Sequence, residues 1–218
     1  MKFLGEPRSG SLQGQTFSRN NAGQYVRNRA TPVQPRTTAQ LAQRARQSNN
    51  AAAWRALTDA QRSGWTSLGL SMTRTDALGQ SYHLTGFQAY CSVNNLKLLV
   101  GDATVSDAPV LTDPGTLASI TLTLTSASFS AAYTATPLGA GIRAIWFASP
   151  QRSAGRNFES DYRFIQATAA AAASPTNLLA AYTAKFGAPA TGKRIFLKGV
   201  LYQLGFEGPP FGLNQVVA

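Results

Sequence analysis

The sequence predicts an α+β protein in three parts: an N-terminal extended arm with a β-hairpin, a small helical domain, and an antiparallel β-sandwich with one crossover helix. Three observations predict this order. Short alternating segments lie among glycines and polar residues in residues 1–36, and three Thr-x-x-Gln helix starts fall in residues 37–105. Apolar side chains then follow a two-residue period through residues 106–218, which is typical of half-buried strands. The 218 residues suit one large domain or two smaller ones.

Positive charge is concentrated near the N-terminus. Residues 1–75 contain eleven Lys or Arg and two acidic residues, a net charge of +9, whereas the remaining residues contain nine and seven, a net charge of +2. Ten of those eleven are Arg, whose planar guanidinium pairs with both oxygens of a carboxylate or phosphate. This asymmetry is typical of a surface that faces nucleic acid, an anionic surface or an acidic protein patch, and a solvated basic face is the simpler alternative.

The arm contains two segments with the alternation of strands, residues 15–19 and 24–27. Residues 20–23 between them suit a hairpin turn. A two-stranded hairpin is marginally stable in water, so we expect it to lie against another domain, a neighbouring subunit or a ligand. Pro32 and Pro35 hold the chain after the hairpin extended.

Three capping boxes predict three helix starts, at Thr37 with Gln40, Thr58 with Gln61, and Thr85 with Gln88. The first helix is expected over residues 38–57, and the second is expected to stop at Gly69. Residues 72–84 read as a short extended excursion. The apolar face of the third helix is predicted to consist of Phe87, Tyr90, Cys91, Asn94 and Leu98.

Six strands are predicted after turn formers near residues 107–115, and together they read as an immunoglobulin-like or fibronectin-like sandwich with one face buried. The predicted strands are residues 120–125, 128–134, 142–148, 162–168, 195–204 and 213–217. The crossover helix is expected to begin with Ser174 as N-cap and Pro175 as its first residue, and to end at Gly187.

No arrangement of residues predicts chemistry, so we expect no catalytic, cofactor or metal site. His83 is the only histidine, and Cys91 is the only cysteine, which favours a buried structural thiol. Glu159 and Asp161 form the one close acidic pair, and an ion pair with Arg156 or Arg163 is favoured over paired acid and base catalysis.

The N-terminus lacks the apolar region of a signal peptide, and no segment has the roughly 18 apolar residues that span a membrane. We therefore expect synthesis in a cytoplasm and no membrane partner. The Arg-rich helical part also leaves open a DNA reader of the helix-turn-helix kind, with Arg side chains on phosphates. The large sandwich that follows would be superfluous in such a reader.

Four motifs in residues 5–70 resemble the N-terminal region of tailed-bacteriophage and prophage virion structural proteins. They are GSLxG at residues 10–14, GQYVR at residues 23–27, TPVQPRTxAQ at residues 31–40 and WxALTxAQRxxW at residues 54–65. The resemblance implies a non-enzymatic protein of the virion, made in the host cytoplasm and homo-oligomeric within a symmetric assembly.

Within that resemblance, a capsid-associated auxiliary protein of the cement or decoration kind is favoured, and its partners would be the major coat protein or other virion subunits. The predicted partner-binding residues are Tyr25, Val26, Arg27, Arg29, Arg36, Arg44, Arg46 and Trp54. A neck or tail component is the alternative in the same class. A DNA-binding accessory protein, or non-specific contact with packaged DNA, is the alternative for the Arg side chains.

Overall fold

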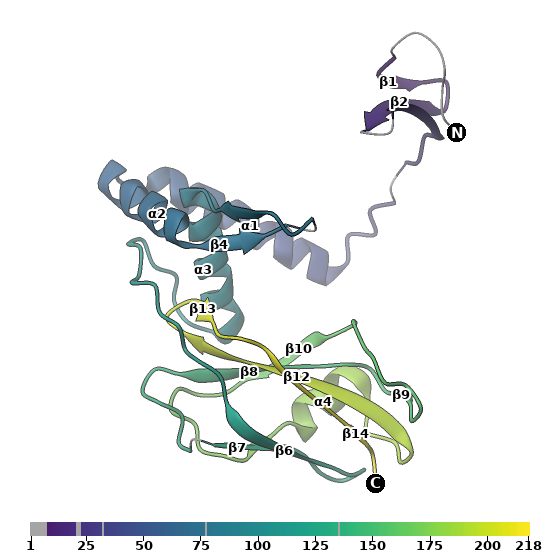
Figure 1. Ribbon diagram of the computed structural model, residues 1–218, viewed down its shortest axis with the longest axis vertical. Helices are drawn as coiled ribbons and strands as arrows, with labels where there is room; N and C mark the ends of the chain where they lie inside the picture. The colour runs from purple at the N-terminus through teal and green to yellow at the C-terminus, as the bar shows by residue number, and fades with distance from the viewer. Residues whose placement is uncertain (1–7, 21–22, 32, 77, 135) are drawn as a thin grey trace. The chain divides into compact units, whose positions relative to one another are not determined.

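The computed structural model describes residues 8–20, 23–31, 33–76, 78–134 and 136–218, in two compact units, Met1–Arg44 and Ala45–Ala218 (Figure 1). The division falls within helix α1 (Thr38–Ala56). Helices and antiparallel sheets occur together, so the predicted α+β class is confirmed. The predicted domain boundaries at 36/37 and 105/106 stay predictions.

The first unit contains a three-stranded antiparallel sheet in the order β1 (Gly10–Leu12), β2 (Gln15–Asn20) and β3 (Gly23–Asn28). The pairing of β2 with β3 confirms the predicted hairpin, with Phe17 opposite Val26. Part of the predicted turn, residues 21–22, lies outside the described residues. The sequence did not predict β1, which turns back onto β2 through Gly14, a residue with a positive φ of 80°.

Three helices begin at the three predicted capping boxes: α1, α2 (Asp59–Ser71) and α3 (Gly86–Val100). In each box the Thr hydroxyl accepts the backbone N–H of the Gln at 3.3 Å, and the Gln side chain accepts the backbone N–H of the Thr at 2.9–3.3 Å. Two otherwise unpaired N–H groups are satisfied at each start, which is why these positions fix the helix ends.

Gly69 is not the stop that the sequence predicted, because α2 continues through it to Ser71. Its role is close packing: a Cβ at this position would lie 2.5 Å from the carbonyl oxygen of Leu84. The chain between these two residues forms a hairpin of β4 (Thr73–Thr75) and β5 (Ser81–His83), which confirms the predicted extended excursion.

A buried aromatic cluster holds the helices together. Trp65 is fully buried, its ring meets Tyr90 edge-on at 5.1 Å, and its indole N–H donates to the carbonyl of Ser106 at 2.7 Å. The buried members of the cluster are Leu57, Trp65, Leu68, Ala89, Tyr90, Val93 and Phe206. Phe206 comes from the sheet part of the chain, so both parts contribute to this core.

All six predicted strands are present, and three short ones are additional. The six-stranded sheet consists of β8 (Arg143–Ala148), β9 (Arg152–Ser153), β10 (Arg163–Ala167), β12 (Lys193–Gln203), β13 (Phe206–Glu207) and β14 (Phe211–Val216). The smaller sheet consists of β6 (Ala118–Leu124), β7 (Phe129–Thr134) and β11 (Thr176–Asn177). Strand β12 organises the larger sheet because it pairs with β8, β9, β13 and β14.

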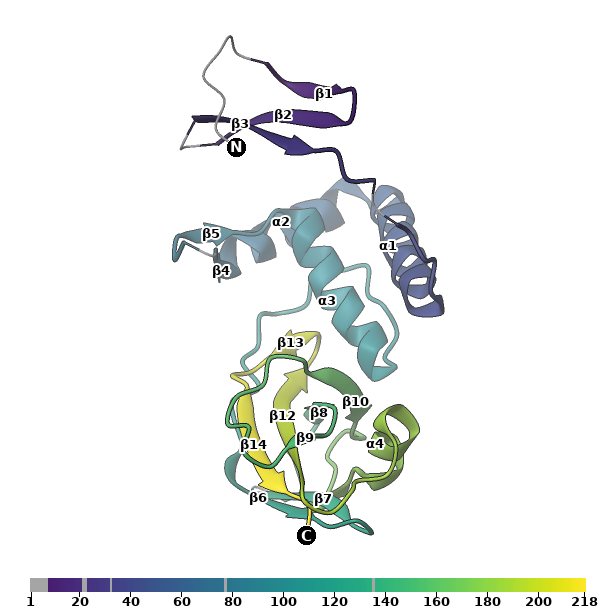
Figure 2. The same cartoon turned by 90° about the vertical axis from the view of Figure 1, so that its right-hand side faces the viewer.

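The two sheets share one core with helix α4 (Leu179–Phe186). Phe129 from the smaller sheet, Trp146 from the larger sheet and Tyr182 from α4 are each almost completely buried. The opposite face of the larger sheet is covered in part, because Val100 at the end of α3 packs against Ile145 and Tyr202 (Figure 2). The prediction of one buried face is therefore wrong for part of β8, where residues 144–146 are buried in succession.

The crossover helix starts later than predicted. Thr176 and Asn177 pair with β7, and the side chain of Asn177 accepts the N–H of Leu179 at 3.0 Å. Ser174 does not cap the helix, since its hydroxyl accepts the N–H of Tyr133 at 2.8 Å instead. The predicted end at Gly187 is confirmed, with a positive φ of 85°.

Candidate interaction surfaces

The three-stranded sheet of the first unit gathers three apolar side chains on one of its faces. Directly opposite residues of antiparallel strands project to the same side, and side chains alternate along each strand. The register therefore places Leu12, Phe17 and Val26 on one face, where Gln15, Arg19, Gln24 and Asn28 surround them. Tyr25 and Arg27 lie on the other face, with Thr16 opposite Arg27.

This sheet has no core of its own. Among residues 8–19, 23–31 and 33–44, no residue is buried, and Leu12 is 63 % exposed. Tyr25 and Val26 are half-buried, whereas Arg27, Arg29 and Arg36 are exposed. A small sheet with an open apolar face usually needs a covering element to be stable in water.

The first three turns of α1 are also exposed on nearly all sides. From Thr38 to Asn49 only Arg46 is half-buried, and Arg44 donates a hydrogen bond to the side chain of Gln34. A helix that is polar all round is stable when it bridges other parts or is covered by a partner. Burial begins at Asn50, whose side chain donates to that of Asn95 at 2.9 Å.

Trp54 has partners within the chain. Its ring is half-buried and lies 5.7 Å from the ring of Phe87 and 5.5 Å from that of Tyr90. The predicted partner-binding residues thus divide between the units, with Tyr25 to Arg44 in the first, and Arg46 and Trp54 in the second. Their predicted role in binding a partner stays a prediction.

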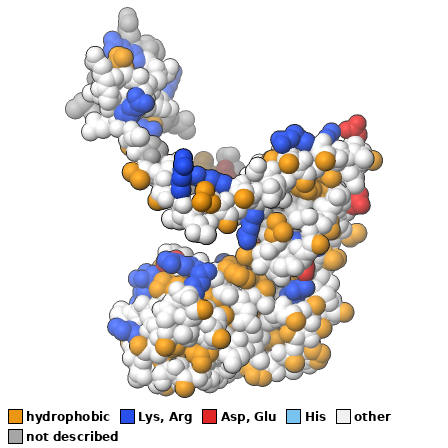
Figure 3. Space-filling model, turned by 180° about the vertical axis from the view of Figure 1, so that it is seen from behind, with side chains coloured by type: hydrophobic (Ala, Val, Ile, Leu, Met, Phe, Trp, Pro, Cys, Tyr) orange, Lys and Arg blue, Asp and Glu red, His pale blue; other side chains and the backbone are white. Residues whose placement is uncertain are grey.

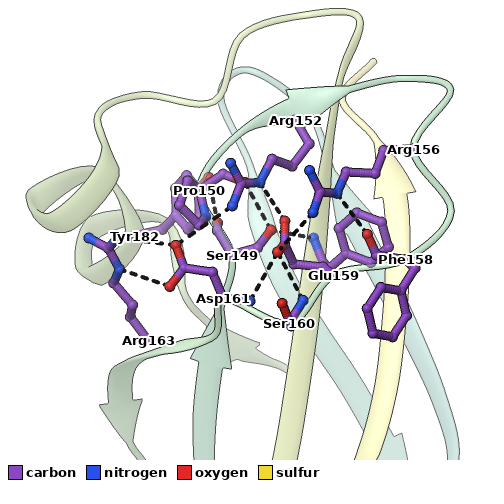
Figure 4. A network of polar contacts seen from close by, with 11 residues as sticks. Ser149, Pro150, Arg152, Arg156, Phe158, Glu159, Ser160, Asp161, Arg163 and Tyr182 are labelled. Carbon is purple, nitrogen blue, oxygen red and sulfur yellow. Dashed lines mark hydrogen bonds and ion pairs between the residues drawn. The ribbon is translucent and has the colours of Figure 1, made fainter. Parts of the chain in front are cut away.

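A second charged surface lies on the sheet part of the second unit, and we call it the Arg cluster. Its members are Arg152, Arg156, Glu159, Asp161 and Arg163 (Figure 4), and Arg194, which strand pairing sets opposite Arg152. Glu159 is at its centre, with only 1 % of its side chain exposed. Its carboxylate accepts hydrogen bonds from Arg152 and Arg156 and from the backbone N–H groups of Ser160 and Asp161.

These donors favour the ionised form of Glu159. The backbone N–H of Asp161 contributes most and the guanidinium of Arg152 comes next, and together with the weaker donors they lower the pKa of Glu159 to about 2. Asp161 pairs with Arg163 through both oxygens, at 3.2 and 3.1 Å. The predicted ion pairing of these two acids with Arg156 or Arg163 is confirmed: Glu159 pairs with Arg156, and Asp161 with Arg163.

Sequence reasoning missed two members of the Arg cluster. Arg152 lies on β9 and Arg194 on β12, and the register sets them directly opposite each other. They are far apart in the chain, so only strand pairing brings them together. The sequence did contain one indication of the cluster, because a basic residue lies on each side of the acidic pair, at Arg152 and Arg163.

His83 and Cys91 lie apart from the Arg cluster. His83 is exposed on β5, and Cys91 is half-buried on α3, where burial raises the pKa of its thiol. Within the described ranges, no three His, Cys, Asp or Glu side chains stand close enough to hold a metal ion.

The described chain thus presents two candidate surfaces for partners, the sheet of the first unit, which buries no residue of its own, and the Arg cluster of the second. None of the helices in the described part is long and apolar enough to cross a bilayer. When the chain is compared with protein-family models, with curated protein sequences and with solved structures, none of them matches it.

Proposed function

We propose that this protein is a non-enzymatic structural component of a tailed-bacteriophage virion, most specifically a capsid-associated auxiliary protein of the cement or decoration kind. In this proposal the N-terminal region anchors the chain to coat subunits. The protein is made in the host cytoplasm and acts as one of many copies in a symmetric assembly.

The observation that carries the proposal is the first unit, which forms a sheet without burying any side chain among residues 8–19, 23–31 and 33–44. Those residues include six Arg and no acidic residue. An arm of this kind gains its core when its apolar face covers a neighbouring subunit. The exposed side chains of Arg27, Arg29 and Arg36 then pair with carboxylates at the edge of that contact.

The free energy that the anchoring contact contributes can be calculated from the apolar side chains of the sheet. Complete burial of a side chain of this size contributes about 1.5–3 kcal/mol. Covering Leu12, Phe17 and Val26 would therefore contribute about 5 kcal/mol at most, since Phe17 and Val26 are already half-buried. The outer edges of β1 and β3 could add backbone hydrogen bonds to strands of a partner.

We further propose that the sheet part of the second unit is an immunoglobulin-like or fibronectin-like sandwich. Two antiparallel sheets that share one apolar core support this. In the assembly this domain would be held on the coat by the N-terminal arm.

The copy number of this chain in purified particles tests the proposal. Quantitative mass spectrometry against the major coat protein should give hundreds of copies for a shell component. A dozen copies or fewer would move the protein to the neck or tail. Absence from particles would overturn the virion role and favour the alternative, in which the Arg-rich helices bind DNA.

A further inference from the structure

The Arg cluster carries more positive charge than its own carboxylates balance. Six cationic side chains lie in or beside it, against Glu159 and Asp161. They are Arg152, Arg156, Arg163, Lys185, Lys193 and Arg194. Figure 3 shows Lys and Arg side chains gathered on the left of the sheet part. The excess of four positive charges makes this surface attractive to a polyanion.

Arg194 is the member without an anionic partner. Strand pairing sets it opposite Arg152, and like charges in directly opposite positions repel. One of its terminal nitrogens donates to the side-chain oxygens of Asn157 and Asn214, at 3.1 and 3.3 Å. No ion pair among the described residues includes Arg194. Its two hydrogen-bond acceptors are neutral amide oxygens, so its positive charge is not balanced by a carboxylate.

Phe158 places an exposed aromatic ring beside the Arg cluster. Phe158 is 74 % exposed, although its backbone is held in place because its carbonyl accepts the Nε–H of Arg156 at 2.7 Å. The residue before it, Asn157, is tied to Arg194. Residues 153–157 and Ser160 around the ring are exposed and small, polar or charged, so Phe158 is a single ring among cations and not part of an apolar patch.

This combination favours one class of partner over the others. A stable protein partner usually covers about 800 Å² on each side, with an apolar centre, and a single ring does not supply that centre. A second copy of this chain that docked through the same surface would bring the same excess of positive charge and be repelled there. Single-stranded nucleic acid needs cations for its phosphates and an aromatic face for a base, and both are present.

We infer that the Arg cluster with Phe158 binds single-stranded nucleic acid, with phosphates facing Arg156, Lys193 and Arg194 and a base stacked on the Phe158 ring. This binding does not depend on the virion role. It uses a surface separate from the Arg-rich N-terminal helices, which are the other candidates for contact with nucleic acid.

Fluorescence anisotropy of the full chain with a labelled oligothymidine tests the inference. Phe158→Ala should weaken binding about tenfold, since stacking on one aromatic side chain has effects of this order. Lys193→Gln should lower the slope of log affinity against log salt by about 0.7, the value for one phosphate contact on a single strand. The matched controls Leu78→Ala and Arg74→Gln change an exposed apolar and an exposed basic residue elsewhere and should leave the affinity unchanged.

Both test residues are exposed, so the variants are expected to fold, and thermal unfolding checks this. Photo-crosslinking with a thiolated thymidine should label the peptide that contains Phe158. Equal affinity of Phe158→Ala, Lys193→Gln and the wild type would overturn the inference, as would crosslinks confined to residues 8–62. Tighter binding of a poly-glutamate peptide than of the oligonucleotide would also overturn it and assign the surface to an acidic protein segment.

Discussion

Asp102 is expected to be the strongest single polar link between the helices and the larger sheet. It follows α3, and its two carboxylate oxygens accept from Arg143 at 2.7 Å and from the phenol of Tyr202 at 2.8 Å. Burial first, and then the hydrogen bond to Asp102, raise the pKa of Tyr202, so the phenol stays protonated and donates. Asp102→Ala removes both acceptors at once.

The expected loss follows from these contacts. A hydrogen bond to a charged group contributes about 1.5–3 kcal/mol. Asp102 and Arg143 are each 25 % exposed, so water can replace part of what Arg143 loses, whereas Tyr202 is buried and its hydroxyl loses the carboxylate that accepts its hydrogen bond. We therefore expect Asp102→Ala to lower the free energy of unfolding by about 3 kcal/mol. The control is Asp59→Ala, which breaks an ion pair at a 99 % exposed carboxylate and should cost at most about 1 kcal/mol.

Urea unfolding followed by circular dichroism and tryptophan fluorescence measures both changes. A double-mutant cycle with Tyr202→Phe should give a coupling energy of about 1 kcal/mol or more, because the two groups are in direct contact. A coupling energy of zero, or equal losses for Asp102→Ala and Asp59→Ala, would refute the role assigned to Asp102.

Three further predictions concern packing, pH and the arm. Gly69→Ala should destabilise the protein by about 1–3 kcal/mol, because the added Cβ meets the backbone of Leu84 at 2.5 Å. Gly64→Ala in the same helix has room, with its nearest contact at 3.7 Å, and should be neutral or stabilising by up to about 1 kcal/mol; equal thermal shifts for the two would contradict this. The pKa of Glu159 is lowered from 4.5 to about 2 on folding, so its stabilisation should be complete above pH 4.5 and lost as the pH falls toward 2. Glu159→Gln should therefore flatten the pH dependence of urea unfolding in that window, and an unchanged profile would count against the ionised state. Leu12→Arg should leave the thermal midpoint unchanged because Leu12 is 63 % exposed, while particles assembled with this variant should lose the protein; normal incorporation would contradict the anchoring role of the arm.

The sequence predicted features that depend on residues close together in the chain. Each capping box needs a Thr and a Gln three residues apart, and all three formed. The two-residue period located all six longer strands of the sheet part, and Gly187 marked a helix end because glycine tolerates a positive φ. The ion pairs at Glu159 and Asp161 were predictable for the same reason, since their Arg partners lie two or three residues away.

The candidate surfaces were predictable only in part. Arg27, Arg29 and Arg36 are exposed, as partner-binding residues must be, whereas Trp54 packs on the rings of Phe87 and Tyr90. A Trp in an amphipathic helix has the same pattern whether it faces a partner or a neighbouring helix, and only the tertiary structure distinguishes the two.

Tertiary structure alone decided the features that join distant segments. The sequence suggested Gly69 as a stop, but the approach of Leu84 made it a packing position. Pairing of β9 with β12 set Arg152 opposite Arg194 and so created the excess charge beside Phe158. Local sequence determines where the backbone hydrogen bonds of a helix or strand begin and end, whereas the identity of the neighbour on each face depends on which distant segments pack together.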